Sequence, residues 1–287
     1  MTTTLGTTAA PTGREPLSRS PWRDVPAYRQ IINSRLRTTL AYRQNVFFLL
    51  AILILQIFIL RKVWTALYQG HTTVDGLTLH ALLVYITLAN LQNWVLQDPT
   101  ISFYMYNRVR EGQVAFDLVR PVGFVPQMFA HLVGSSFATV IFGLVALPFI
   151  FFAGTLGAPA SPTALLLYLA SFVLGYVITT LLTLMLGMFA FWTTEISGLT
   201  MLYRLINQFF AGALVPVSLF PGAIRIIADV LPFQATTYTP VAIYVGRVRG
   251  ADALGALGVQ AVWVVLLIFA SWAMWRRALH RVVVQGG

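Results

Sequence analysis

Apolar residues along this chain gather in long runs that short polar stretches separate. A helix needs about 20 mostly apolar residues to cross the hydrocarbon core of a bilayer. Six runs approach that length, and we expect six transmembrane helices, at residues 45–65, 77–96, 127–153, 163–192, 196–217 and 254–275. The run at 196–217 differs from the others because polar side chains interrupt it: Arg204, Asn207 and Gln208.

The residues before the first run divide into two parts. Residues 1–27 are rich in Thr, Pro and Ser and lack an apolar core, so we expect a disordered cytoplasmic tail. In residues 28–43 the isoleucines and leucines share one helical face while arginines supply positive charge, which is typical of an amphipathic helix at a membrane interface. A solvated linker helix is the alternative. We expect residues 28–287 to form a single six-span transmembrane domain.

Composition supports a membrane protein. The chain is 57% hydrophobic and 10% charged, whereas a typical soluble domain has about 25% charged residues. A chain this apolar cannot hide its surface in one water-soluble core. We therefore expect an all-α integral membrane fold rather than a soluble enzyme with buried helices. The chain has no cysteine, which excludes disulfides and thiolate chemistry.

The positive charge predicts the orientation. The formal net charge is +10, and most basic residues lie outside the apolar runs, which argues for topology signals beside a membrane rather than nucleic-acid binding. With the N-terminus inside, ten arginines flank the spans on the inner side and five basic residues lie on the outer side. Because cytoplasmic loops carry the excess of Arg and Lys, we expect both termini in the cytoplasm.

The chain has a single lysine, Lys62, in the sequence "ILRKVW". A phosphate-binding loop of the form GxxxxGK[ST] is therefore impossible in this chain. Any ATP and Mg²⁺ must be bound by another polypeptide, and we expect no cofactor site, metal site or catalytic residue here. The histidines are scattered through the sequence and are interpreted as packing residues.

A short charged segment interrupts the apolar runs between the second and third spans. Residues 98–112 are predicted to form a helix that Asp98 caps and Gly112 ends. Apolar residues recur every four positions within it, and the polar residues Arg108, Arg110 and Glu111 occupy other faces. A solvated connector is the alternative, but such a connector needs no capped helix with an apolar stripe.

Prolines divide the segment between the fifth and sixth predicted spans, residues 221–246, into pieces of about ten residues. Such a piece is about 15 Å long as a helix, or half the thickness of the hydrocarbon core. It can enter the membrane and return only where protein surrounds it. An ordinary surface loop is the alternative, although the many apolar residues argue against it.

Polar residues inside predicted spans are candidates for lining a transport pathway. Arg204, Asn207 and Gln208 are spaced so that they share a helical face. The alternative is that Arg204 reaches the cytoplasmic surface or pairs with Glu195. Asn90 and Asn93, near the inner end of the second span, are further candidates, with local hydrogen bonding as the alternative.

Three sequence segments together resemble one family. "RVREGQVAFDLVRP" is similar to the cytoplasmic-loop signature of ABC-2 type transporter permeases, in the branch with an Arg-rich helix, a Gly and then Asp-Leu-x-Arg-Pro. "AYRQNVFFLL" with "VWTALYQG", and the later "GALVPVSLFPGAIRIIADVLPFQATTYTPVAIYVG", resemble the first span and the late segment of that branch. The resemblance covers roughly residues 28–287.

The resemblance implies a function and partners. It implies a permease subunit of an ABC exporter in the bacterial cell membrane, with two re-entrant outer helices. The helix at 98–112 would be a coupling helix that docks on a dimer of ATPase subunits. The coupling residues would be Asp98, Arg108, Arg110, Glu111 and Gly112. A second permease, identical or related, would complete the pathway.

Two other functions remain as alternatives. The first is a secondary transporter driven by protons or sodium, which usually places acidic residues within its spans; here no Asp or Glu lies deep in a predicted span. The second is an integral-membrane enzyme, which would need His, Asp or Glu clustered at one membrane face. The sequence does not identify the cargo.

Overall fold

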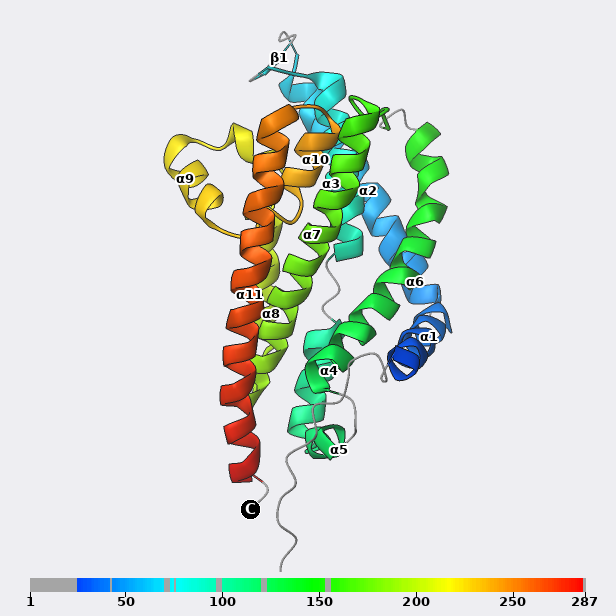
Figure 1. Ribbon diagram of the computed structural model, residues 1–287. Helices are drawn as coiled ribbons and strands as arrows, with labels where there is room; N and C mark the ends of the chain where they lie inside the picture. The colour runs from blue at the N-terminus through cyan, green and yellow to red at the C-terminus, as the bar shows by residue number, and fades with distance from the viewer. Residues whose placement is uncertain are drawn as a thin grey trace, which may run out of the picture.

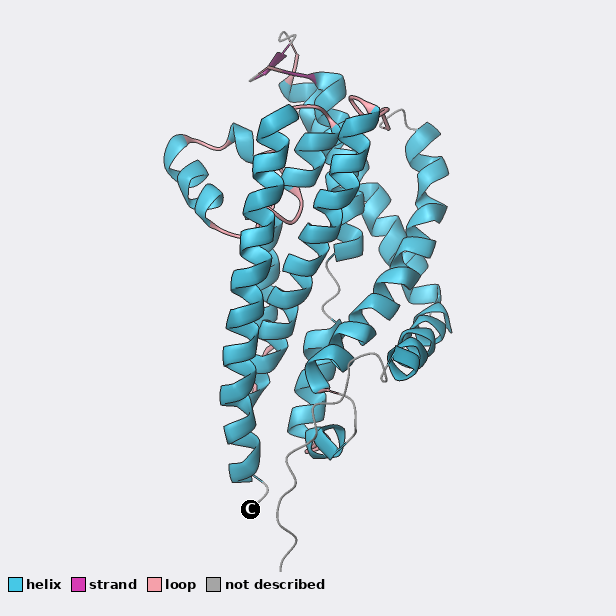
Figure 2. Ribbon diagram, in the orientation of Figure 1, coloured by secondary structure: helices cyan, strands magenta, loops and turns pink. Residues whose placement is uncertain are grey.

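A computed structural model describes residues 25–41, 43–69, 73–74, 76–96, 100–119, 123–152 and 156–285. Most of the predicted N-terminal tail lies outside the described residues, but its last three residues belong to a helix that begins at Val25. Nearly all of the described chain is helical, with one two-stranded hairpin (Figure 2). This confirms the all-α fold.

The helices are α1 (Val25–Ala41), α2 (Arg43–Leu67), α3 (Leu79–Leu96), α4 (Thr100–Arg110), α5 (Val114–Val119), α6 (Phe124–Phe152), α7 (Pro162–Met188), α8 (Ser197–Phe210), α9 (Gly222–Val230), α10 (Tyr238–Tyr244) and α11 (Gly250–Gln285). The strands β1 (Thr73–Val74) and β2 (Leu77–Thr78) pair antiparallel. Two 3₁₀ turns, η2 (Phe189–Phe191) and η3 (Val217–Leu219), flank α8.

By length and composition, five candidate membrane spans are found among the described residues: Phe47–Leu67, Leu79–Arg110, Phe124–Val145, Pro162–Phe191 and Gly250–Arg281. The second of these combines α3 with α4 and runs over residues 97–99, which the structure does not describe. Five of the six predicted spans therefore have a long helix. The sixth, predicted at 196–217, is different: α8 has 14 residues and is about 21 Å long. The helix ends at Phe210 because Gly212 adopts a left-handed conformation, with φ of +77°.

The long helices run roughly along one axis (Figure 1). Helix α7 packs against α11, α1 packs against α6, and α2 packs against α3. Helices α1, α4 and α5 and the C-terminal end of α11 lie at one end of the molecule, and the strand hairpin lies at the other (Figure 1). The charge pattern predicts that the first of these ends is cytoplasmic, and we call it the inner end.

The distribution of side chains suits lipid rather than water. Large apolar residues cover the lateral surface; Phe48 on α2 is 70% exposed and Phe269 on α11 is 64% exposed. Polar residues such as Gln260 and Ser171 are fully buried between helices. This arrangement fits a bilayer, where apolar side chains face the surroundings and polar ones bond across helices.

Candidate functional site

Helix α4 matches the predicted charged helix. It ends at Arg110, and Gly112 follows with φ of +69°, donating its N–H to the Val109 carbonyl at 3.2 Å. No other atom lies within 4 Å of the place where a Cβ at residue 112 would stand. The glycine is thus required for the left-handed turn and not for space. Asp98, the predicted cap, lies outside the described residues.

The apolar stripe of α4 anchors it to the bundle. Ile101 and Met105 are buried in a cluster with Leu184 and Met188 of α7. Ser102 Oγ donates to the Thr183 carbonyl at 3.1 Å, which joins the two helices further. Because α4 packs this closely on α7, a force applied to α4 reaches the inner end of a predicted span.

Arg108 bridges α4 and α5. Its Nε and Nη2 both donate to the Asp117 carboxylate, the latter bond being 2.7 Å, and its Nη1 donates to Gln113 Oε1 at 3.1 Å. The Asp117 side chain is fully buried and that of Arg108 is 17% exposed. The pattern of the sequence did not indicate this pair, because its partners lie nine residues apart across a glycine turn. Arg108 is therefore engaged within the chain.

Arg110 and Glu111 are exposed at the turn between α4 and α5. Arg110 Nη1 donates to the Tyr106 hydroxyl at 3.1 Å, and this hydroxyl donates to the Thr194 carbonyl at 2.7 Å. Glu111 Oε2 accepts from Gln113 Nε2 at 2.7 Å. These two charges remain available on the surface, whereas the charge of Arg108 does not.

The Asn90 side chain of α3 forms hydrogen bonds within its own helix and with neighbouring segments. Its Nδ2 donates to the Ile86 carbonyl at 2.8 Å and to the Ala213 carbonyl at 3.1 Å, and its Oδ1 accepts from Gln56 at 2.9 Å. Both Asn90 and Asn93 are buried. These bonds engage both ends of the Asn90 amide, and pathway roles for Asn90 and Asn93 stay predictions.

The outer segment contains two short helices, α9 and α10, in agreement with the two that the resemblance implied. Their re-entry into the membrane stays a prediction. Between them, Ala235 and Thr236 are buried among α3, α7 and α11. Gln260 of α11 donates to the Ala235 carbonyl and Gln92 of α3 donates to the Thr236 carbonyl, each at 2.7 Å. The two glutamine side chains thus provide hydrogen bonds to carbonyl groups of non-helical backbone, which lipid could not provide.

Helix α7 is shaped to receive the same segment. A Cβ at Gly175 would stand 2.7 Å from the Thr236 carbonyl oxygen, so only glycine allows this approach. Ser171, one turn earlier, donates to Gln260 Oε1 at 2.9 Å. Sequence reasoning missed Gln260 and Gly175; a lone amide in an otherwise apolar span was the available signal for Gln260.

Helix α8 separates the three polar residues that were predicted to share a face. Arg204 is exposed, Gln208 is half-buried, and Asn207 is buried at 1% exposure. Within the described chain, no acidic side chain forms an ion pair with Arg204. The expected alternative partner, Glu195, accepts instead from the Ser197 N–H at 2.7 Å, and hydrogen bonds from Ser197 lower the pKa of its carboxyl.

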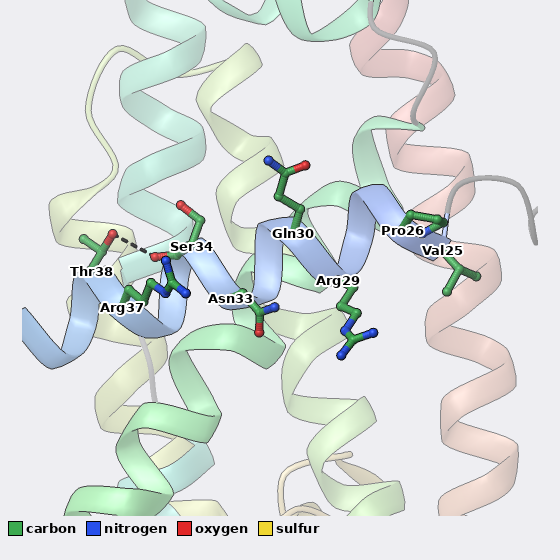
Figure 3. Close-up of a pocket in the computed structure, with 8 residues that line it drawn as sticks. All are labelled: Val25, Pro26, Arg29, Gln30, Asn33, Ser34, Arg37 and Thr38. Carbon is green, nitrogen blue, oxygen red and sulfur yellow. Dashed lines mark hydrogen bonds between the residues drawn. The ribbon is translucent and has the colours of Figure 1, made fainter.

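Helix α1 has the expected amphipathic character. Its apolar side is half-buried against α6, where a Cβ at Gly134 would stand 2.7 Å from the Ile32 carbonyl oxygen. The opposite side lines a shallow groove that includes Arg29 and Arg37 (Figure 3). Its location at a membrane interface stays a prediction.

Acidic, histidine and cysteine side chains do not gather in groups of three or more anywhere in the described residues. The absence of a metal or catalytic site stays a prediction from the sequence.

A comparison with models of protein families gives the family of this chain. The family model described as "ABC-2 family transporter protein" matches residues 48–286. Among curated proteins, no sequence matches the chain significantly. The family match extends over α2 through α11 and so includes the α4–α5 unit, α8 and the outer segment.

Proposed function

We infer that this chain, which belongs to the ABC-2 transporter family, couples ATP hydrolysis by a separate ATPase to the export of a cargo. Membership makes it a multi-pass membrane component of an ABC transporter, and the family associates with ABC ATPases in general. A second permease, identical or related, completes the pathway. An ATPase dimer binds ATP and Mg²⁺, and both termini lie in the bacterial cytoplasm.

This proposal rests on the packing of the α4–α5 unit against the long helices at the inner end. Val114 of α5 is buried against Phe191 of η2, which directly follows α7, and against Ala278 of α11. Met105 of α4 is buried against α6 and α7. A unit fixed to three long helices transmits a rigid-body movement, which a flexible loop would absorb. Closure of the ATPase dimer would therefore move the ends of these helices.

Helix α8 supports a shared pathway between two permeases. Arg204 is exposed beside apolar side chains that are also exposed, including Met201 at 66% and Leu205 at 56%. An arginine facing lipid at this depth is costly, so charged residues in spans usually face protein or a water-filled cavity. A second permease that packs near α8 would enclose a polar route and shelter Arg204.

The outer segment closes the pathway in this proposal. Its turn is fixed by Gln92 and Gln260, whereas α9 is largely exposed, with Ile226 and Val230 each 67% exposed. Because the turn is held in place and α9 is exposed, α9 can move while the turn stays fixed. Rearrangement of the core helices would then open the outer side.

Reconstitution tests this function. The chain is co-expressed with an ABC ATPase encoded beside it, purified as a complex and placed in liposomes. We expect the two to co-purify, and a panel of hydrophobic compounds to contain at least one that raises ATP hydrolysis and accumulates in inside-out vesicles only with ATP. Accumulation driven by an ion gradient without ATP would support the secondary-transporter alternative instead.

A further inference from the structure

We propose that Phe116 of α5 is the apolar anchor by which the ATPase subunit grips this permease, and that the Arg108–Asp117 pair holds Phe116 outward. This inference rests on the proposed function and names the contact within it. The principal docking contact is then Phe116 of α5 rather than the arginines of α4 that the resemblance implied.

The burial pattern of α5 is the reverse of the usual one. Among its described side chains, Asp117 is fully buried while Phe116, its neighbour, is 73% exposed. Aspartate is almost never fully buried unless it is paired, whereas phenylalanine is among the residues most often buried. A rotation of this one-turn helix by about one residue would exchange the two side chains. The observed rotation therefore needs a specific cause.

The cause is the bonding of Arg108. Its guanidinium donates to both oxygens of Asp117 and to Gln113 Oε1, so it fixes the turn and α5 together. Tyr104 lies beneath the same guanidinium, with the ring centroid 5.4 Å from the Arg108 Cζ atom. A bidentate pair of this kind fixes orientation as well as distance. On the same side of α5, Val114 is buried against Phe191 and Ala278.

The position of Phe116 argues for a protein partner rather than lipid. Helix α5 lies at the inner end of the molecule, toward the level of the C-terminal end of α11 and farther along the axis than α1 (Figure 1). Since α1 is predicted to lie at the membrane interface, α5 projects into water. Exposed charges at Arg110 and Glu111 surround the turn before it. A large exposed aromatic side chain with a charged rim is typical of the centre of a protein interface.

The ATPase is the partner that fits this position. The family associates with ABC ATPases, and the tip that carries Phe116 is packed on the inner ends of α6, α7 and α11. An ATPase that binds Phe116 would transmit its movement to these helices through Val114 and the Arg108–Asp117 pair. Lipid and a second permease are expected along the sides of the bundle instead.

Binding affinity between the ATPase and the full-length permease in nanodiscs tests the anchor. Central aromatic anchors usually cost at least 2 kcal/mol when truncated, so Phe116→Ala is expected to weaken binding about 30-fold. Phe116→Leu should retain more of the affinity. The matched control is Phe48→Ala on α2, since Phe48 is 70% exposed but lies on the lateral surface; it should leave ATPase affinity unchanged.

The role of the pair is tested by combining substitutions. Asp117→Asn should weaken ATPase binding by about tenfold, because a neutral amide cannot accept both N–H donors of Arg108. If Asp117 acts by placing Phe116, the double variant should bind within about twofold of Phe116→Ala alone. Fully additive losses would mean that the pair does not act through Phe116.

The possible failures are distinct. If the wild-type permease binds no ATPase, the proposed function itself is wrong. If the wild-type binds and Phe116→Ala binds equally well, only the anchor is wrong. Equal losses in Phe116→Ala and Phe48→Ala would also overturn the anchor, because they would indicate a general effect of removing surface aromatics.

Discussion

At the scale of single residues, the two arginines at the inner end have different roles despite their similar sequence context. Arg108 bonds a fully buried carboxylate, whereas Arg110 is exposed and bonds a tyrosine hydroxyl. Breaking a buried ion pair typically costs about 3–5 kcal/mol, because one charge is left without a partner. An exposed charge contributes roughly 0–1 kcal/mol. Their substitutions should therefore be distinguishable.

We predict that Arg108→Gln destabilises the α4–α5 unit by roughly 2–4 kcal/mol, at or below the range for a buried pair because Arg108 is partly exposed. Arg110→Gln should change its stability by less than about 1 kcal/mol. Hydrogen exchange of the amides at residues 111–119 measures local opening directly. Equal protection in the two variants would show that the Arg108–Asp117 pair does not hold this unit together.

Gly112 provides a second test at this scale. Its left-handed backbone disfavours side chains in general, and β-branched ones most, while asparagine tolerates it. Since no atom crowds the position, Gly112→Asn should be almost neutral and Gly112→Val should loosen the turn by roughly 1–2 kcal/mol. ATP hydrolysis stimulated by the permease is the measurement. A valine variant with wild-type stimulation would show that the turn need not be rigid.

At the scale of elements, the sequence predicted those helix ends that a glycine or a proline marks. Gly112 marked the end of α4, and prolines marked the short outer helices. The end of α8 was missed because apolar residues continue to Val217, which hid the turn at Gly212. The sequence also did not show that Arg204 is exposed while Asn207 is buried, because residues three apart on a helix share a face only in part. Contacts across the fold, such as Gln260 with Ala235, leave no local pattern.

The anchoring of the outer segment gives a prediction for α11. Gln260→Leu removes the donor to the Ala235 carbonyl and leaves this oxygen buried without that partner. Hydrogen bonds between membrane helices contribute about 0.6–2 kcal/mol, so we expect a loss of that size in the unfolding free energy. Ser271→Ala on the same helix is the control, since the buried Ser271 Oγ has no hydrogen-bond partner among the described residues.

Thermal unfolding in detergent compares these two variants. The Gln260→Leu variant should unfold at a lower temperature than the wild type, and the Ser271→Ala variant should match the wild type. Faster proteolysis near residues 231–237 would locate the change to the outer segment. If both variants unfold like the wild type, the bond from Gln260 does not anchor this segment.

At the scale of the whole molecule, we propose that the short α8 also crosses the membrane. It begins near the inner end of α7, and the turn that follows it meets α3, where the Tyr85 hydroxyl donates to the Gly212 carbonyl at 2.8 Å. The non-helical chain after Gly212 then continues toward the outer end. Six crossings would place α1 and the end of α11 on the same side of the membrane, and Figure 1 shows both at the same end of the molecule.

Cysteine labelling tests this topology, since the chain contains no native cysteine. Glu111→Cys at the α4–α5 turn should react only from the cytoplasm, and Thr73→Cys in β1 should react only from outside. Both residues are exposed, so access to the reagent depends on the side of the membrane. Reaction of both positions from the same side would contradict the predicted crossing of α3 between them.

Docking of an ATPase on the α4–α5 unit should shield this unit and move the helices that pack behind it. Hydrogen exchange of the purified permease in nanodiscs, with and without its ATPase, tests this most directly. We predict that ATPase binding slows exchange at residues 110–117 and leaves β1 and β2 at the other end unchanged. ATPase binding without slower exchange at residues 110–117 would contradict the account.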